Sequence, residues 1–347
     1  MIENDLQKRI RPVAIWVLIG VVMLMIQVVL GGITRLTGSG LSITEWKPIL
    51  GAVPPTTEQA WLEAFEKYKT IGQYKQINFH FTLSDFKFIY FWEWFHREWA
   101  RLIAVAFAIP FVIFLFQKRF TKAMITPLLV LFAMGGLQGA IGWIMVASGL
   151  NDENIYVSHF KLAIHFISAL VLVNFAVWFA LRLLVQKPAQ ILPAAPRKQL
   201  FWLLALTVLQ LIYGAFMAGL KAALAAPTWP TINGSWFPES MTGNVLHDVI
   251  TIHFIHRGLA YLLVVATLAW WWKNRAATGY KPFDRWKNVP VLLIFAQLAL
   301  GILTVLNATQ PNLLILFGAL HQFIGMAFAS SIVVSIYLLK PTGLNLK

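Results

Sequence analysis

Residues 288–339 form a run of 52 residues that contains no charged side chain. A bilayer-spanning helix needs about 20 predominantly apolar residues, so this run is long enough for two spans. The polar residues 307–312 lie near its middle and predict the connection between the two spans. An uncharged run of this length is typical of a membrane protein.

Shorter apolar runs recur along the rest of the chain. The 347 residues are 59% hydrophobic and 12% charged, with a mean hydropathy of +0.69. This composition excludes a water-soluble enzyme, a disordered chain and a secreted disulfide scaffold. The further apolar runs cover residues 12–34, 88–117, 123–150, 162–181, 199–220 and 247–272. We therefore expect an all-α membrane protein with eight transmembrane helices in a lipid bilayer.

The basic residues predict how the spans are oriented. Lys and Arg gather before the first span, in the loops between spans 2 and 3, 4 and 5, and 6 and 7, and after the last span. The positive-inside rule then places both termini in the cytoplasm. Glu3 and Asp5 argue against an acid-poor transit peptide, so we expect a bacterial inner membrane. The net charge of +14 is partly an orientation signal, and we expect no nucleic-acid partner.

The chain contains an internal repeat of four spans. The dipeptide His96-Arg97 recurs as His256-Arg257, and a set of landmarks recurs at an offset of 183 residues. These landmarks are Gly31, Trp46, Ile49 and Gly51, which recur as Gly214, Trp229, Ile232 and Gly234. An even number of spans gives both halves the same orientation. We predict two pseudo-twofold-related four-helix bundles, at residues 1–185 and 199–347, joined by a cytoplasmic linker at 186–198. The first half has an external segment, residues 35–87, with about 23 extra residues.

Four of the eight histidines are expected at a similar depth in the membrane, one from each even-numbered span. They are His96, His165, His256 and His321. Each lies eight or nine residues from the expected start of its helix, which is roughly 12 Å below the outer end. Polar residues inside a membrane point to function. His80, His159 and His247 fall in loops or at helix ends, and we expect them at the surface.

Two histidines per bundle suit a particular kind of metal site. The sequence has no cysteine, and a pair of imidazoles on facing helices suits a haem with two histidine ligands. Zinc normally takes three or four protein ligands, and copper would be better served by Cys or clustered Met. Structural histidines and proton relays are the alternatives to metal ligands.

The residues beside the histidines differ between the halves. Arg97 and Arg257 could each pair with a haem propionate or extend to the lipid headgroups. Glu93 lies three residues before His96, whereas His253 holds that place before His256. A buried carboxylate could shuttle protons, or it could form an ion pair with Arg97 or Arg101. The asymmetry favours chemistry in the first half and a permanent cofactor in the second, and residues 35–87 could be a lid or a seal.

Several motifs together resemble the haem A synthase family, in a branch without cysteine. They are GGITRLTGSGL at 31–41, EWKP at 45–48, FIY at 88–90, EWFHR at 93–97, TWP at 228–230, FIHR at 254–257 and HQ at 321–322. The resemblance covers nearly the whole chain. Some relatives carry a cysteine pair in the external loops, and that pair is missing from this sequence.

The resemblance implies an inner-membrane oxidoreductase that converts haem O into haem A for terminal oxidases, by oxidising the C8 methyl group to a formyl group. It implies haem b between His256 and His321, and the haem substrate between His96 and His165 with Glu93 as a functional carboxylate. A substrate iron with two histidine ligands is closed, so one ligand must loosen if O2 is to bind. The expected partners are haem O synthase and an electron donor, and a homo-oligomer is compatible with the family resemblance.

Two other functions fit the same residues. A diheme electron-transfer cytochrome would hold a permanent haem in each half. A transporter built from parallel repeats would use the histidines as proton relays and would contain no haem.

Overall fold

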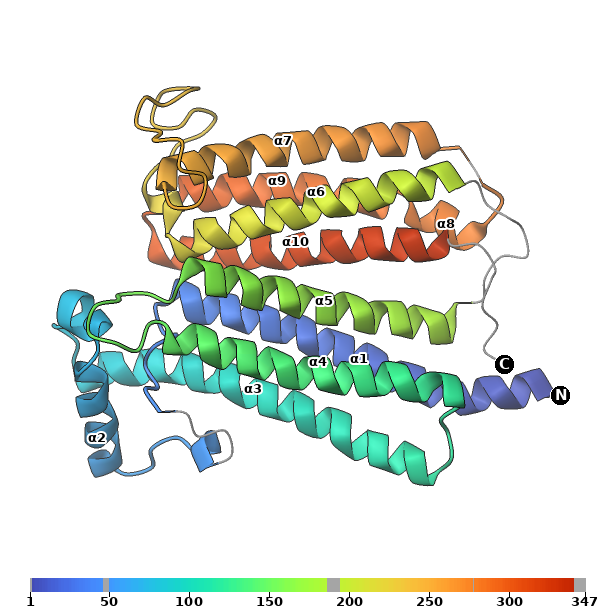
Figure 1. The fold of residues 1–347 in the computed structure, drawn as a ribbon, viewed down its shortest axis with the longest axis horizontal. Coiled ribbons are helices and arrows are strands. Elements are labelled where there is room, and N and C mark those ends of the chain that lie inside the picture. Colours follow the sequence, from blue (N-terminus) through green and yellow to red (C-terminus); the bar gives the residue numbers. More distant parts are fainter. Residues whose placement is uncertain (1, 46–49, 186–193, 277, 340–347) are drawn as a thin grey trace.

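The structure is a computed structural model that describes residues 2–45, 50–185, 194–276 and 278–339. Eight long helices lie side by side along one axis, and shorter helices lie at the two ends of the bundle (Figure 1). The long helices are α1 (Ile2–Leu36), α3 (Leu83–Phe116), α4 (Lys122–Ala147), α5 (His159–Leu184), α6 (Ala194–Gly219), α7 (Val249–Asn274), α9 (Val289–Leu306) and α10 (Pro311–Leu338). Each is part of a helix long and apolar enough to cross a membrane. The prediction of an all-α membrane protein with eight spans is confirmed.

The helices pack in the same way within each half of the chain. In the first half α1 packs against α3 and α5, and α5 packs against α4. In the second half α6 packs against α7 and α10, and α10 packs against α9. The halves meet where α1, α5, α6 and α10 come together. A pseudo-twofold relation would produce these pairings, and the relation itself stays a prediction. Residues 186–193 of the expected linker lie outside the described residues.

Two large apolar clusters lie at the end of the bundle where the expected cytoplasmic loops are. One apolar cluster joins Trp16, Leu128 and Phe179 across α1, α4 and α5. A second cluster joins Leu200 and Phe328 across α6 and α10. Each cluster lies in the halves of these helices that are remote from the histidines. A smaller cluster of Ala163, Phe216 and Ile252 packs beside the histidines.

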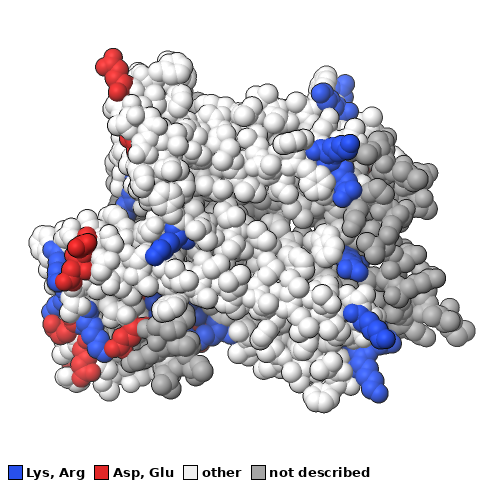
Figure 2. Space-filling model, viewed as in Figure 1, with Lys and Arg blue, Asp and Glu red and all other residues white. Residues whose placement is uncertain are grey.

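The two ends of the bundle differ in charge. The start of α1 and the end of α10 lie at the same end (Figure 1). In the face shown in Figure 2, the charged side chains at that end are basic, whereas acidic side chains gather together with further basic ones at the opposite end. Arg9 at the basic end donates a hydrogen bond to the carbonyl of Lys118. This distribution agrees with the predicted orientation, and the side of the membrane stays a prediction.

The external segment of the first half folds as a helical cap on α3. Helix α2 (Glu58–Lys69) starts at Thr57, whose hydroxyl accepts a hydrogen bond from the Ala60 amide. Its Phe65 and Tyr68 pack on Phe86 of α3, with ring centres 5.0 and 5.4 Å apart. The remaining short elements are η1 (Leu50–Ala52), η2 (Tyr74–Asn78), η3 (Ala222–Leu224) and α8 (Lys281–Trp286).

The even spacing expected between each histidine and its helix start is wrong. His96 lies 13 residues after the first residue of α3, whereas His165 lies only 6 after that of α5. Helix α3 begins early because Thr82 and Asp85 form a capping box beneath the external cap. The helix start is therefore a poor marker of depth in this span.

Candidate functional site

One large cavity lies between the helices and joins the two halves. Its volume is about 1140 Å³, at the upper end of what ligand pockets usually offer. The four histidines predicted as metal ligands line it, and so does His253: the four are His96, His165, His256 and His321. Glu93, Arg97 and Arg257 also line it, so every residue predicted for the site borders the same space.

His256 and His321 face each other across the second half. Their ring centres are 6.4 Å apart and the ring planes are inclined by 76°. A metal about 2 Å from one nitrogen of each imidazole would place the ring centres roughly 6 Å apart. The pair is therefore spaced to bind one metal ion from opposite sides. Within the described residues no three His, Cys, Asp or Glu side chains gather as a metal site.

Each of the four histidine rings lies against a glycine of a neighbouring helix. A Cβ atom on Gly31 would lie 3.1 Å from His96, and one on Gly214 would lie 3.3 Å from His256. The corresponding distances are 2.8 Å for Gly142 and His165 and 2.9 Å for Gly301 and His321. Contacts this short require a neighbour to shift. The absence of a side chain at these four positions is what lets the rings occupy their places.

Four glutamines approach the same histidines and were not predicted as site residues. The amide nitrogen of Gln138 lies 3.0 Å from Nδ1 of His165. Gln210 lies 3.2 Å from Nδ1 of His256 and Gln297 lies 3.2 Å from Nε2 of His321, whereas Gln27 contacts only the His96 carbonyl, at 3.1 Å. In every case the glutamine lies four residues before the glycine that meets the same histidine. This recurring Gln-x-x-x-Gly spacing is a signal that the sequence does carry.

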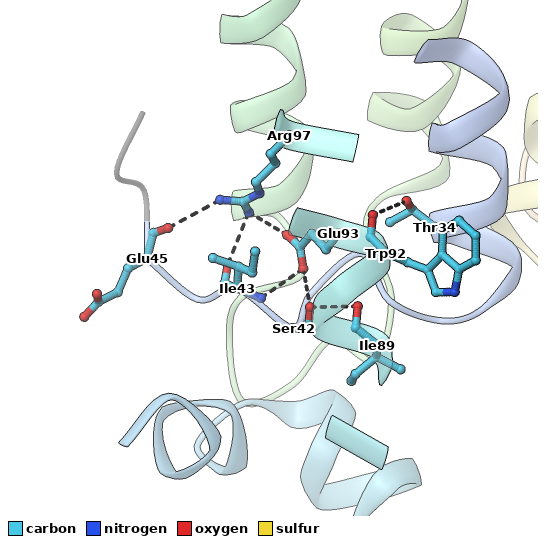
Figure 3. A network of polar contacts seen from close by, with 8 residues as sticks. All are labelled: Thr34, Ser42, Ile43, Glu45, Ile89, Trp92, Glu93 and Arg97. Atoms are coloured by element: carbon cyan, nitrogen blue, oxygen red, sulfur yellow. Dashed lines mark hydrogen bonds and ion pairs between the residues drawn. The ribbon is translucent and has the colours of Figure 1, made fainter. Parts of the chain in front are cut away.

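Glu93 is buried in a polar network at the outer wall of the first half (Figure 3). It is 2% exposed, and one carboxylate oxygen lies 2.5 Å from a guanidinium nitrogen of Arg97. The other oxygen accepts hydrogen bonds from the hydroxyl of Ser42 at 2.7 Å and from the amide of Ile43 at 2.9 Å. The ion pair considered as the alternative role for Glu93 is therefore present. A catalytic role for Glu93 stays a prediction.

The two arginines hold equivalent loops in the two halves. Arg97 donates to the carbonyls of Ile43 and Glu45, at 3.2 and 3.4 Å. Arg257 donates to those of Ala226 and Thr228, at 3.4 and 2.6 Å. Residues 226 and 228 follow 43 and 45 by 183 positions, which is the offset found in the sequence. These hydrogen bonds follow the repeat, and binding of haem propionates by the arginines stays a prediction.

The position of Glu93 is taken by a very different side chain in the second half. His253 is fully buried and lines the cavity. Neither of its ring nitrogens has a hydrogen-bond partner within the described part of the chain. The predicted asymmetry between the halves is thus accompanied by a difference in polar contacts.

Other predicted residues lie away from the histidine pairs or outside the described ranges. His80 and His247 are exposed and His159 is half-buried at the start of α5. Trp229 is 43% exposed, borders the cavity and donates to the hydroxyl of Tyr261 at 3.1 Å. Trp46, Lys47, Pro48 and Ile49 of the external motif and the repeat lie outside the described residues.

Known proteins with similar sequences cover nearly all of this architecture. Residues 14–333 match the family described as cytochrome oxidase assembly protein. A protein named "Heme A synthase" from Parvibaculum lavamentivorans is 43% identical over 314 residues, which are 88% of this chain and 88% of the relative. The chain belongs to the haem A synthase family. Family members from Flavobacterium johnsoniae and Rhodospirillum centenum are 38% and 40% identical, and they match 96% and 95% of this chain and 99% and 89% of their own lengths. The resemblance read from the motifs is confirmed.

Proposed function

We propose that this chain converts haem O into haem A, by oxidation of the C8 methyl group to a formyl group, for use in terminal oxidases. The observation that carries the proposal is the set of four histidines, two from each half, around one cavity in a member of this family. The alternative functions do not account for the family relationship to proteins named for haem A synthesis.

Two haem sites are part of the proposal. Haem b lies between His256 and His321, and the spacing of these rings supports this assignment. The haem substrate lies between His96 and His165, which line the same cavity on α3 and α5. Haem iron supplies the oxygen chemistry when bound, and the protein supplies orientation and an environment that excludes water.

Glu93 and the arginines complete the outer wall of the proposed substrate site. Glu93 fixes the guanidinium of Arg97 at the cavity edge. A fixed guanidinium can bind a carboxylate through charge-assisted hydrogen bonds, and a propionate of the haem substrate offers that group. Arg257 borders the cavity in the second half and is proposed to do the same for haem b.

The remaining proposals concern location and partners. The basic end of the bundle supports a cytoplasmic position for both termini in a bacterial inner membrane. The reaction needs a source of haem O, which a haem O synthase provides, and an electron donor. The chain contains no cysteine, so electrons reach the site without a thiol of this chain.

Four alanine variants and haem chromatography test the assignment of the two sites. The variants are expressed with a source of haem O, and the haems are extracted after turnover. We expect His96→Ala and His165→Ala to keep haem b but make no haem A. His256→Ala and His321→Ala should lose haem b, and the exposed His247→Ala is the control that loses neither. Haem A produced by His96→Ala or His165→Ala would refute the substrate site.

The same experiment separates the alternative functions. Wild-type protein that yields only haem O or haem b under turnover conditions would indicate an electron-transfer cytochrome. A colourless wild-type protein would indicate a transporter.

A further inference from the structure

We propose that the Gln-x-x-x-Gly segments are receptors for the ligand histidines, and that His96 is the one ligand whose ring the receptor does not hold. His96 is then the ligand that yields its place when the substrate site opens. The inference rests on the proposed haem sites and deepens them, because it names the groups that hold three histidines in position and the ligand that moves.

The receptor recurs four times in the fold. Residues four apart on a helix lie one above the other on the same face. The four segments are Gln27 with Gly31 on α1, Gln138 with Gly142 on α4, Gln210 with Gly214 on α6 and Gln297 with Gly301 on α9. In each segment the glycine admits the edge of an imidazole, and the glutamine reaches toward the same histidine. In each case the histidine beside the glycine comes from the next transmembrane span along the chain.

The glutamines of α4 and α6 contact the imidazole rings themselves, Gln138 at Nδ1 of His165 and Gln210 at both ring nitrogens of His256. A metal-bound imidazole coordinates through one nitrogen, and the other N–H is held by a hydrogen-bond acceptor that fixes the ring. Gln138 lies 3.0 Å from Nδ1 of His165, and Gln210 lies 3.2 Å from Nδ1 of His256. A side-chain amide carries both an acceptor and a donor, and a half turn exchanges them. The Gln210 oxygen is buried without a hydrogen-bond partner, so it is available to accept this N–H.

The receptor on α9 holds its histidine through the main chain. Nδ1 of His321 lies 3.1 Å from the carbonyl oxygen of Gln297. A neutral imidazole that donates from Nδ1 has its lone pair on Nε2, and the Gln297 amide nitrogen, 3.2 Å from Nε2, must turn away for a metal to bind there. The ring of His321 is therefore also held, and both proposed ligands of haem b have a fixed orientation.

The receptor on α1 differs from the other three. Gln27 donates to the main-chain carbonyl of His96 at 3.1 Å and does not contact the ring. Among the hydrogen bonds of the described residues, the one from Gln27 reaches the His96 carbonyl and none involves the His96 ring. The side-chain oxygen of Gln27 is buried without a partner. Packing alone, including the contact with Gly31, holds this ring. The substrate site therefore combines one anchored ligand, His165, with one ligand that can swing away.

Matched leucine variants of the glutamines test the receptor. Gln210→Leu and Gln27→Leu remove the same amide from the same position of two receptors. The measurements on purified protein are haem b content and the reduction potential of haem b. We expect Gln210→Leu to weaken haem b retention about tenfold or more. The remaining haem b should have a raised potential, because the loss of the hydrogen bond makes the ligand less basic. Gln27→Leu should change neither value, and unchanged values in Gln210→Leu would overturn the role of the glutamine.

Carbon monoxide tests which ligand of the substrate haem yields. Reduced protein loaded with haem O is titrated with the gas, and the absorption change is followed. We expect His96→Gly to retain haem O and bind carbon monoxide more readily than the wild type, and His165→Gly to lose haem O. The reverse result would overturn the assignment of His96. A wild type that holds no haem at all would instead contradict the proposed function.

A pair of glycine variants tests the position of the His165 ring without changing a polar side chain. Gly142→Ala places a Cβ 2.8 Å from Cε1 of His165, which pushes the ring away from Gln138. Gly139→Ala lies on the same helix and meets nothing within 4 Å. We expect Gly142→Ala to lose haem O as His165→Gly does, and Gly139→Ala to keep it. Equal haem O retention in the two alanine variants would contradict the proposal that Gly142 makes room for the His165 ring.

Discussion

Glu93 and Arg97 form an ion pair one turn apart on α3, with 2.5 Å between carboxylate oxygen and guanidinium nitrogen. Both side chains also hold the segment that follows α1, through Ser42 and the backbone at Ile43 and Glu45. The pair therefore links the outer wall of the cavity to the helix that carries His96.

Removal of the Glu93 charge should destabilise the outer part of the first half. Glu93→Gln leaves the Arg97 guanidinium without its counter-charge, and breaking a buried ion pair costs roughly 3 kcal/mol or more. Arg97 keeps 18% of its side chain exposed, so we expect the lower end of that range. Thermal unfolding in detergent measures the loss. In the Glu93→Gln/Arg97→Gln double variant the loss should be smaller than the sum of the single losses, and strict additivity would argue against a direct pair.

Arg257 should determine the order of the loop that follows η3. Its guanidinium donates to four main-chain oxygens in residues 226–231. Arg257→Gln removes these contacts, and amide hydrogen exchange in this loop should become faster by at least tenfold. Arg257→Lys should preserve only part of the order of this loop, because lysine lacks the planar fork of donors. Arg285→Gln, at an exposed position on α8, is the control and should leave the exchange unchanged.

The start of α7 should lose stability in acid. Asp248 caps this helix, and hydrogen bonds from the Thr251 hydroxyl and from nearby amides lower the pKa of its carboxyl below 3.8. A carboxyl with a lowered folded-state pKa contributes stability above its unfolded pKa, and this contribution disappears as the pH falls through the folded value. Hydrogen-exchange protection of residues 249–253, normalised to the intrinsic exchange rate at each pH, should therefore fall below about pH 4. Asp248→Asn should keep most of the cap and lose this pH dependence.

Tyr68 should hold the external cap together. It is fully buried, its hydroxyl donates to Gln73 at 2.9 Å, and it accepts from Asn78 at 2.7 Å. Burial raises the pKa of Tyr68 to about 12, so the hydroxyl remains a donor at any physiological pH. Tyr68→Phe leaves two polar partners unsatisfied and should destabilise the cap by about 1–3 kcal/mol.

Limited proteolysis within residues 57–80 measures the effect of Tyr68→Phe. The matched control is Tyr74→Phe, because the Tyr74 hydroxyl makes a single contact with the Phe79 carbonyl in an exposed setting. Equal protection of the two variants would show that the buried hydroxyl contributes nothing.

The spans and the four histidines were predictable because both follow from composition along the chain. A bilayer requires long apolar runs, and a histidine inside such a run stands out. The expected span at 88–117 starts five residues after α3 does, since Phe86 and the capping box at Thr82 belong to contacts with the cap. Helix α2 was not predicted, because Phe65 and Tyr68 form its apolar face within an otherwise polar segment.

The polar contacts of the site were only partly predictable. Arg97 lies one helical turn and Arg101 two turns after Glu93, and in the structure Glu93 pairs with Arg97 whereas Arg101 pairs with Glu98. Gln138 and Gly142 recur in the second half as Gln297 and Gly301, but their role depends on which face of α4 meets α5. That relation between neighbouring helices is not contained in the spacing along one helix.

The arginine contacts explain how the two halves can differ in length. Arg97 donates hydrogen bonds to the carbonyls of residues 43 and 45, in the segment that follows α1. Arg257 donates to those of the equivalent residues 226 and 228. The longer connection of the first half lies beyond these hydrogen-bonded residues, between Glu45 and Leu83. Chain can therefore be added or removed there without moving the helix that carries the histidine. The outer surface of each half is open to evolutionary change while the interior keeps its geometry.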